Sequence, residues 1–320
     1  MPRFDIVFGP VYSRRLGLSL GINNIPYKYC SYTCIYCQLG RTIRLTIERK
    51  PFSNPNEIVR AVAEKLAGLD KPVDYVTFVP GGEPTLDTML GRDIEALKKE
   101  LGVRVAVLSN ASLLWIKEVR EDLASADTVS VKVDAGDEAV WKRVDRPHPS
   151  LSFNKVVEGI LEFRDEYGGR LITETMLVKD VNDSIEELRK IAVLIEEIRP
   201  ATAYIMVPVR PPAEPWVRPA SAEALVALYR MLEERGIGAE ILGRPEPPPP
   251  PPHEDPLRFV AATVAVHPLR LSYVQRIFEE KGLSIEAALK ELINKYGVEV
   301  VSYGGEKFLV RRPRAEIAKK

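Results

Sequence analysis

Three cysteines are the residues whose type and spacing point most clearly to chemistry. Cys30, Cys34 and Cys37 are the only cysteines in the chain, and they form a Cys-x-x-x-Cys-x-x-Cys pattern. A [4Fe–4S] cluster normally takes four thiolate ligands, so three would leave one iron without a protein ligand. An iron with an open position can bind a small molecule and react with it. The spacing therefore predicts a [4Fe–4S] cluster with an open iron.

Two other uses of cysteine fit the pattern less well. A structural zinc site would need a histidine as fourth ligand, and His148, His253 and His267 all lie more than a hundred residues further along the chain. Zinc sites usually contain paired Cys-x-x-Cys units, and the chain has no second pair. A disulfide is disfavoured by the odd count, and the first residues lack the apolar stretch of a secretory signal. We therefore expect a soluble cytoplasmic protein in a reducing compartment, with no membrane span.

A second motif extends the cysteine pattern to a family resemblance. Residues 78–86 read Phe-Val-Pro-Gly-Gly-Glu-Pro-Thr-Leu and follow a predicted strand. Together with Cys-Ser-Tyr-Thr-Cys-Ile-Tyr-Cys at residues 30–37, this stretch resembles the radical S-adenosylmethionine (SAM) superfamily. The resemblance implies that the open iron chelates the amino and carboxylate groups of SAM. One electron from the cluster then cleaves SAM into methionine and a 5′-deoxyadenosyl radical, which takes hydrogen from a substrate.

The resemblance also implies contacts between SAM and individual residues. Tyr36 is expected to lie against the adenine, and Gly81, Gly82, Glu83 and Pro84 are expected to bind the amino group of the methionine part. Glycines there let the backbone approach a ligand closely. Close relatives often have glycine at the position before this motif, where this chain has a proline, which offers no N–H to a ligand.

Polar residues on three later strands are expected to complete the site. Ser109 and Asn110 end the third predicted strand, where the resemblance implies contact with SAM or substrate; a helix-opening pair is the alternative. Lys132 and Asp134 alternate along the fourth strand and so face the same way. The resemblance implies that they contact the ribose or the carboxylate of SAM. The alternative is that they face outward and are solvated. Glu174, on the fifth strand, allows the same two interpretations.

A basic cluster follows the fourth predicted strand. Lys142, Arg143, Arg146 and His148 lie at the expected mouth of the barrel. An ordinary solvated loop and recognition of an anionic substrate group such as phosphate are both open interpretations. Arg210, after the sixth strand, is expected to rim the same opening.

The elements that must hold these residues alternate between short β-rich runs and longer amphipathic stretches. Strands are predicted at residues 16–22, 74–79, 104–108, 128–133, 171–178 and 203–207. Helices are predicted at residues 56–67, 93–101, 116–124, 153–167, 184–198 and 220–235. Strands separated by helices pair in parallel through right-handed crossovers. We therefore expect an α/β fold, a partial (β/α)6 TIM-like radical SAM barrel, with its chemistry at the carboxyl ends of the strands.

Three parts are predicted along the chain: a radical SAM core over residues 1–243, a proline-rich linker over 244–256 and a small domain over 257–320. The six consecutive prolines Pro247–Pro252 exclude helix and central strand, and they suit a stiff extended spacer, with a docking site for a partner domain as the alternative.

The small domain is predicted to be winged-helix-like and basic. Its predicted helices lie at residues 257–266, 273–281 and 285–295, and a hairpin with a glycine turn lies at residues 299–310. This order resembles a winged helix. Residues 257–320 carry twelve Lys and Arg and seven Asp and Glu, a net charge of +5, in a chain of zero net charge.

These patterns favour a radical SAM enzyme with one [4Fe–4S] cluster and an unidentified substrate. The chain most resembles iron–sulfur oxidoreductases grouped near the wyosine tRNA synthases, but it lacks their additional cluster cysteines, so their substrate is not carried over. A one-electron reductant of the ferredoxin or flavodoxin type is the expected partner. The C-terminal domain is expected to recognise RNA, a peptide or a protein, with a structural cap as the alternative. The competing hypothesis is a non-enzymatic iron–sulfur sensor that binds DNA through that domain.

Overall fold

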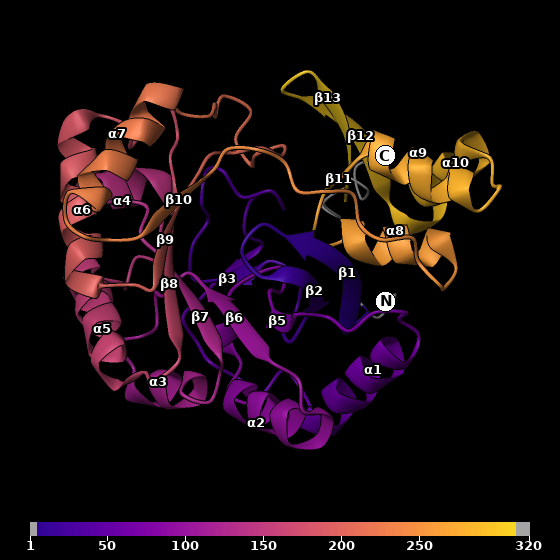
Figure 1. Ribbon diagram of the computed structural model, residues 1–320, viewed down its shortest axis with the longest axis horizontal. Coiled ribbons are helices and arrows are strands. Elements are labelled where there is room, and N and C mark those ends of the chain that lie inside the picture. The colour runs from indigo at the N-terminus through magenta and orange to yellow at the C-terminus, as the bar shows by residue number, and fades with distance from the viewer. Residues whose placement is uncertain (1–4, 312–320) are drawn as a thin grey trace.

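A sheet of eight strands forms the body of the protein in a computed structural model that describes residues 5–311 (Figure 1). The strands, in sheet order, are β1 (Val7–Ser13), β2 (Gly17–Ile22), β5 (Tyr75–Phe78), β6 (Val105–Ser109), β7 (Thr128–Lys132), β8 (Arg170–Met176), β9 (Thr202–Met206) and β10 (Ala239–Leu242). β1 pairs with β2 in antiparallel fashion, and every later pair of neighbours is parallel. The sheet curls into an open wall, which confirms the predicted α/β fold and partial TIM-like barrel.

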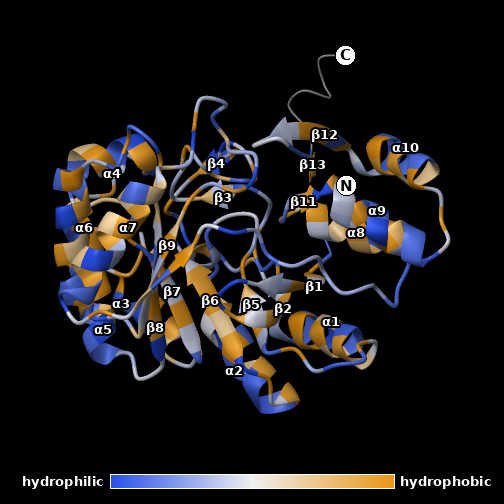
Figure 2. Cartoon of the chain, turned by 45° about the horizontal axis from the view of Figure 1, so that its top comes forward, coloured by the Kyte–Doolittle hydropathy of each residue, from blue (hydrophilic) through white to orange (hydrophobic). Residues whose placement is uncertain are grey.

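Helices cover the outer face of this sheet. They are α1 (Pro55–Ala67), α2 (Leu90–Leu101), α3 (Lys117–Leu123), α4 (Glu138–Val144), α5 (Phe153–Glu166), α6 (Ile185–Ile198) and α7 (Ala222–Glu233). Strand residues such as Val76, Val107 and Val129 are fully buried because both faces of a parallel sheet are covered. In Figure 2, β6 is largely orange and the surrounding helices carry both colours, as amphipathic helices do. Within residues 5–311, no helix has the length and apolar character needed to cross a lipid bilayer.

The structure adds three barrel elements that the sequence analysis misses. β1 contains a proline, and its register with β2 shifts between Phe8 and Val11, so its pattern does not alternate regularly. β10 is a partly exposed strand at the other edge of the sheet, and it makes the parallel strands one more than the six predicted. α4 is a seven-residue helix that begins at a cap formed by the side chain of Asp137. These elements are short or irregular, so a periodic pattern cannot reveal them.

A separate unit follows the barrel. It contains α8 (Pro256–Val264), β11 (Leu269–Arg270), α9 (Leu271–Glu280), α10 (Ile285–Tyr296), β12 (Val298–Tyr303) and β13 (Glu306–Arg311). Its three strands form an antiparallel sheet in the order β11-β13-β12, and its core includes Phe259, Phe278, Leu292 and Leu309. The winged-helix assignment of this unit stays a prediction. Residues 312–320, which were included in the predicted domain, lie outside the described residues.

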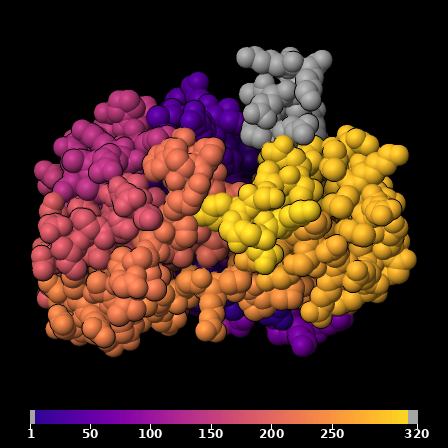
Figure 3. Space-filling view, turned by 90° about the horizontal axis from the view of Figure 1, so that it is seen from above, coloured from indigo at the N-terminus to yellow at the C-terminus, as the bar shows by residue number. Residues whose placement is uncertain are grey.

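The segment between the two units runs along the barrel. Residues 243–255 contain no helix or strand, and Glu254 forms an ion pair with Lys65 of α1. α8 packs against β1, and the hydroxyl of Tyr303 donates to the carbonyl of Pro208 at 3.1 Å. In Figure 3 the yellow hairpin accordingly reaches the orange segment that follows β9. The C-terminal unit therefore touches both the first strand of the sheet and a loop at the carboxyl ends of the strands.

Candidate active site

The three cysteines lie in the long loop that follows β2, at the carboxyl edge of the sheet. This loop contains a two-stranded ribbon of β3 (Tyr29–Cys30) and β4 (Arg44–Leu45). The backbone N–H of Ile35 donates to the carbonyl of Val144 at 3.0 Å, and the Ile35 side chain is completely buried. The segment between the cysteines is thus anchored to the end of α4 and to the barrel core.

The glycine motif lies directly beside the cysteine loop. The Gly81 carbonyl accepts from the N–H of Lys28 at 2.7 Å, and the N–H of Glu83 donates to the carbonyl of Tyr29 at 3.0 Å. A Cβ on Gly82 would lie 1.8 Å from the Tyr29 carbonyl oxygen, so only glycine fits there. Because Gly82 has no side chain, the loop after β2 and the loop after β5 can pack together into one wall.

Glu83 ties this wall to the end of β6. Its carboxylate accepts from the N–H and hydroxyl of Thr85 at 3.1 and 2.7 Å, from the Ser109 hydroxyl at 2.7 Å and from the Asn110 N–H at 2.7 Å. Burial raises the pKa of Glu83, and these donors act against that rise. Because both carboxylate oxygens are engaged, Glu83 acts here by positioning the two loops.

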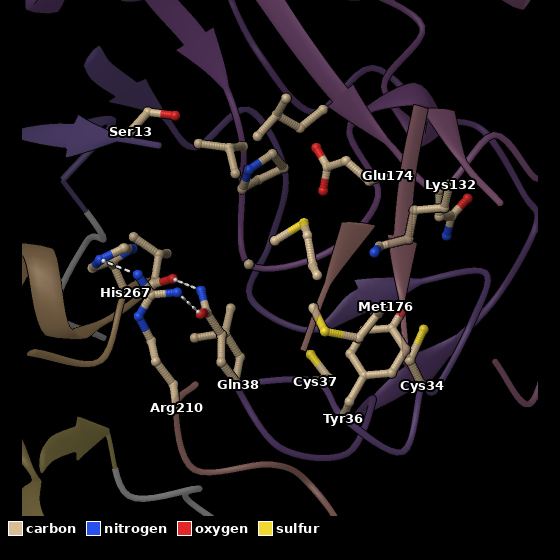
Figure 4. A pocket seen from close by; sticks show the side chains of 18 of the residues that line it. Ser13, Cys34, Tyr36, Cys37, Gln38, Lys132, Glu174, Met176, Arg210 and His267 are labelled. Carbon is tan, nitrogen blue, oxygen red and sulfur yellow. Dashed lines mark hydrogen bonds between the residues drawn. The ribbon is translucent and has the colours of Figure 1, made fainter. Parts of the chain in front are cut away.

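These loops and the strand ends enclose a cavity of about 300 Å³ (Figure 4). Eleven of the thirteen site residues predicted from the sequence line it: Cys30, Cys34, Tyr36, Cys37, Gly81, Gly82, Glu83, Ser109, Asn110, Lys132 and Glu174. Pro84 and Asp134 do not line the cavity; Pro84 instead begins a single 3-10 turn, η1 (Pro84–Leu86). The fold therefore brings together residues from five strand ends.

Hydrogen-bond donors lie next to the sulfur atoms. Lys28 Nζ is 3.2 Å from Cys37 Sγ, and Asn110 Nδ2 is 3.6 Å from Cys30 Sγ. Asn110 is held in place because its Nδ2 also donates to the Ser31 hydroxyl at 2.9 Å. Such donors stabilise thiolates that bind metal, and they adjust the electronic properties of a cluster.

Buried charge distinguishes Cys37 from the other two thiols. Burial raises the pKa of Cys30 to about 12 and raises the pKa of Cys34 well above its ordinary value. Burial is the largest influence on Cys37 and acts to raise its pKa, but the ammonium of Lys28, the backbone N–H of Leu39 and the charge of Lys132 together lower this pKa below its ordinary value. Lys28 is only 3% exposed, and a buried cation beside a sulfur suits an anionic sulfur ligand.

The donor set fits a cluster better than a single metal ion. In the described part of the chain, no three His, Cys, Asp or Glu side chains converge on a point where one metal ion could be held. A cubane attaches each cysteine to a different iron, so its ligands surround a common space rather than converge on one point, and these three thiols line one cavity. His148 and His253 do not line the cavity, and His267 faces Arg210 and Glu246 instead.

Asp134 orients Tyr36 from outside the cavity. Its carboxylate accepts from the Tyr36 hydroxyl and, at 2.6 Å, from the N–H of Met176. Lys132 Nζ lies 4.9 Å from the centre of the Tyr36 ring and 3.7 Å from Asp134. The ring and the ammonium thus offer a ligand a fixed aromatic surface and a cation, whereas the carboxylate of Glu174 beside them is engaged by Arg15 and by the Ser130 hydroxyl (Figure 4).

The basic cluster that follows the fourth predicted strand, now β7, lies outside the cavity. Lys142, Arg143, Arg146 and His148 are not among the residues that line the cavity, whereas Arg210 is. Arg146 instead forms an ion pair with Glu214 at 2.5 Å.

Several lining residues escape sequence reasoning. Lys28 is one basic residue in a loop, and its burial against a cysteine depends on the glycine motif that folds over it. Arg14 and Arg15 belong to the turn between β1 and β2, and His267 belongs to the C-terminal unit.

Comparison with known proteins agrees with this geometry. Residues 24–192 match the family model of the radical SAM superfamily. This chain therefore belongs to the radical SAM superfamily, whose members bind a [4Fe–4S] cluster and SAM, so the cofactors expected from the sequence are confirmed.

Individual relatives extend the likeness along the chain. A UPF0026 protein of Methanocaldococcus jannaschii is 38% identical over 310 residues, which cover 96% of both chains. A UPF0026 protein of Helicobacter pylori is 40% identical over 60% of this chain and 63% of its own length. The crystal structure of a radical SAM methyltransferase from Sphaerobacter thermophilus shares the fold, with a TM-score of 0.52 and 18% identity over 70% of this chain and 66% of that chain.

Lys28→Met is expected to make the reduction potential of the bound cluster more negative. One positive charge at roughly 6 Å in an effective dielectric of about 20 favours the reduced cluster by on the order of 3 kcal/mol. For a one-electron couple this corresponds to a shift of about 130 mV. Redox titration followed by electron paramagnetic resonance measures it. Lys71→Met, at an exposed lysine, is the control, and an equal potential in both variants would contradict the assigned role of Lys28.

Proposed function

We propose that this chain uses a [4Fe–4S] cluster held by Cys30, Cys34 and Cys37 to cleave SAM reductively, and that the resulting 5′-deoxyadenosyl radical takes hydrogen from a substrate. The observation that carries the proposal is that three thiols, with no fourth cysteine in the chain, line one cavity together with the glycine motif. When bound, the cluster supplies an electron and an iron without a protein ligand.

The residues of the cavity have complementary tasks in this proposal. Lys28 and Asn110 hold N–H groups beside the sulfur atoms. Burial is the largest influence on Lys132 and acts to lower its pKa, but the surrounding acidic groups, led by Asp134 and Glu174, together raise it above its ordinary value. Lys132 therefore stays charged and is suited to the carboxylate of SAM. The Tyr36 ring is fixed by its hydroxyl and offers a surface for the adenine.

Formation of 5′-deoxyadenosine tests the proposal directly. The protein would be reconstituted with iron and sulfide under anaerobic conditions, reduced with dithionite and incubated with SAM. We expect 5′-deoxyadenosine and methionine in the reduced sample and neither in an unreduced one, as measured by liquid chromatography. An intact, reducible cluster that never cleaves SAM would contradict the enzyme and favour the DNA-binding iron–sulfur sensor.

Two partners are part of the proposal. A ferredoxin or flavodoxin would deliver the electron in a reducing compartment such as the cytoplasm. The C-terminal unit would bind RNA, a peptide or a protein, and its positive charge favours RNA. Binding of transfer RNA that weakens as salt rises supports this choice. Absence of binding at low salt would remove nucleic acid as the partner.

A further inference from the structure

Three arginines line the part of the cavity next to the C-terminal unit. Arg14 and Arg15 come from the turn between β1 and β2, and Arg210 comes from the loop after β9. His267, which follows α8, also lines the cavity, and its Nε2 lies 3.1 Å from Arg210 Nη2. Figure 4 shows Arg210 and His267 on one side of the cavity and Cys34 on the other. A molecule bound in the cavity can therefore contact the arginines on one side while the cysteines lie on the other.

Two of the three guanidinium groups have carboxylate partners. Arg15 Nη1 lies 2.6 Å from Glu174 Oε2, and Arg210 forms an ion pair with Glu246 and donates to Gln38 Oε1 at 2.9 Å. Even so, the Nε–H groups of Arg15 and Arg210 are buried and have no hydrogen-bond partner in the part of the chain that the structure describes. A buried donor without a partner costs free energy unless a ligand satisfies it.

Arg14 is the third guanidinium group, and it forms no ion pair within residues 5–311. Its Nη1 donates to the carbonyls of Leu242 at 2.6 Å and Arg244 at 3.1 Å. Burial, together with the positive charge of Arg210, lowers the pKa of Arg14 to about 10. A guanidinium group held through one nitrogen keeps its other N–H donors for a ligand. Three arginines thus face two carboxylates, and the surplus positive charge is on Arg14.

We propose that Arg14, supported by Arg15 and Arg210, forms a subsite for an oxyanion group of the substrate, a phosphate or a carboxylate. The planar guanidinium group binds both of these through paired hydrogen bonds. The inference rests on the proposed function, because the ligand is the molecule from which hydrogen is taken. His267 and Glu246 complete the same wall, so the C-terminal unit and the linker help to close the subsite.

Titration calorimetry of the full-length, anaerobically reconstituted protein tests the subsite, with inorganic phosphate in one arm and malonate in the other. Each arm is run with and without SAM. The wild-type protein is expected to bind at least one of the two, and the tighter one identifies the oxyanion. Arg14→Gln is expected to weaken that binding at least about tenfold, as expected when a charge-assisted hydrogen bond is lost. Arg60→Gln, at an exposed arginine of α1, is the matched control and is expected to bind like the wild type.

Arg14→Lys covers the case in which the glutamine variant does not fold, because lysine keeps the positive charge but loses the paired donors. Intermediate affinity in this variant supports the subsite. Failure of the wild type to bind either anion at millimolar concentrations, or an equal loss in Arg60→Gln, would overturn it. A loss of SAM binding with unchanged anion binding in Arg14→Gln would also overturn it. The titration needs no SAM cleavage, so Arg14-dependent anion binding by a protein that never forms 5′-deoxyadenosine would support the subsite and contradict the proposed function.

Discussion

Replacing Cys34 by alanine is expected to abolish both the visible absorbance of the cluster and the formation of 5′-deoxyadenosine, and the same result is expected for Cys30 and Cys37. Two thiolates would leave two irons without protein ligands, and no other cysteine exists in the chain to replace the lost one. Absorbance and iron content after anaerobic reconstitution measure the first effect. Chromatography after reduction with SAM measures the second.

Ile43→Ala is the matched control for the cysteine variants. Ile43 lies in the same loop but is 64% exposed, so its truncation removes no packing from the cavity. The control should keep full absorbance and full SAM cleavage. A single cysteine variant that keeps a stable cluster and cleaves SAM would show that its thiol is not a ligand.

Gly82→Ala is expected to produce the second-largest effect, loss of cluster incorporation together with loss of stability. The added methyl group would lie 1.8 Å from the carbonyl oxygen of Tyr29, the residue before the first cysteine. This oxygen belongs to the backbone, so the clash moves the cysteine loop and breaks the hydrogen bond that Glu83 donates to the same carbonyl. Overpacking of this kind costs on the order of 3 kcal/mol in the free energy of unfolding. Urea denaturation measures this cost, and iron content measures the cluster.

Gly68→Ala provides the comparison for this variant. Gly68 ends α1, and a Cβ there meets its nearest atom at an ordinary 3.6 Å, so the variant should fold and bind iron like the wild type. Equal iron content in Gly82→Ala and Gly68→Ala would contradict the view that close approach of the two loops builds the cluster site.

The sequence by itself determined the cofactors and the kind of fold. Cys30, Cys34 and Cys37 are close along the chain, so one loop can present all three thiols to a single cluster. The alternation of short apolar runs with amphipathic stretches requires parallel pairing, which places residues that follow the strands, such as Ser109 and Glu83, at one edge. Both inferences depend on local spacing and periodicity, which are properties of the sequence alone.

Only the tertiary structure decided which role each side chain of the site has. It turns Asp134 away from the cavity to orient Tyr36, engages every oxygen of Glu83 and buries Lys28 against Cys37. It also brings the C-terminal unit to the cavity wall, where the amide of Gln38 donates to the carbonyl of Val266, 228 residues further along the chain. Such contacts follow from the packing of distant segments, whose free energy depends on the whole molecule. No local pattern encodes which cation or carboxylate will be buried beside which partner.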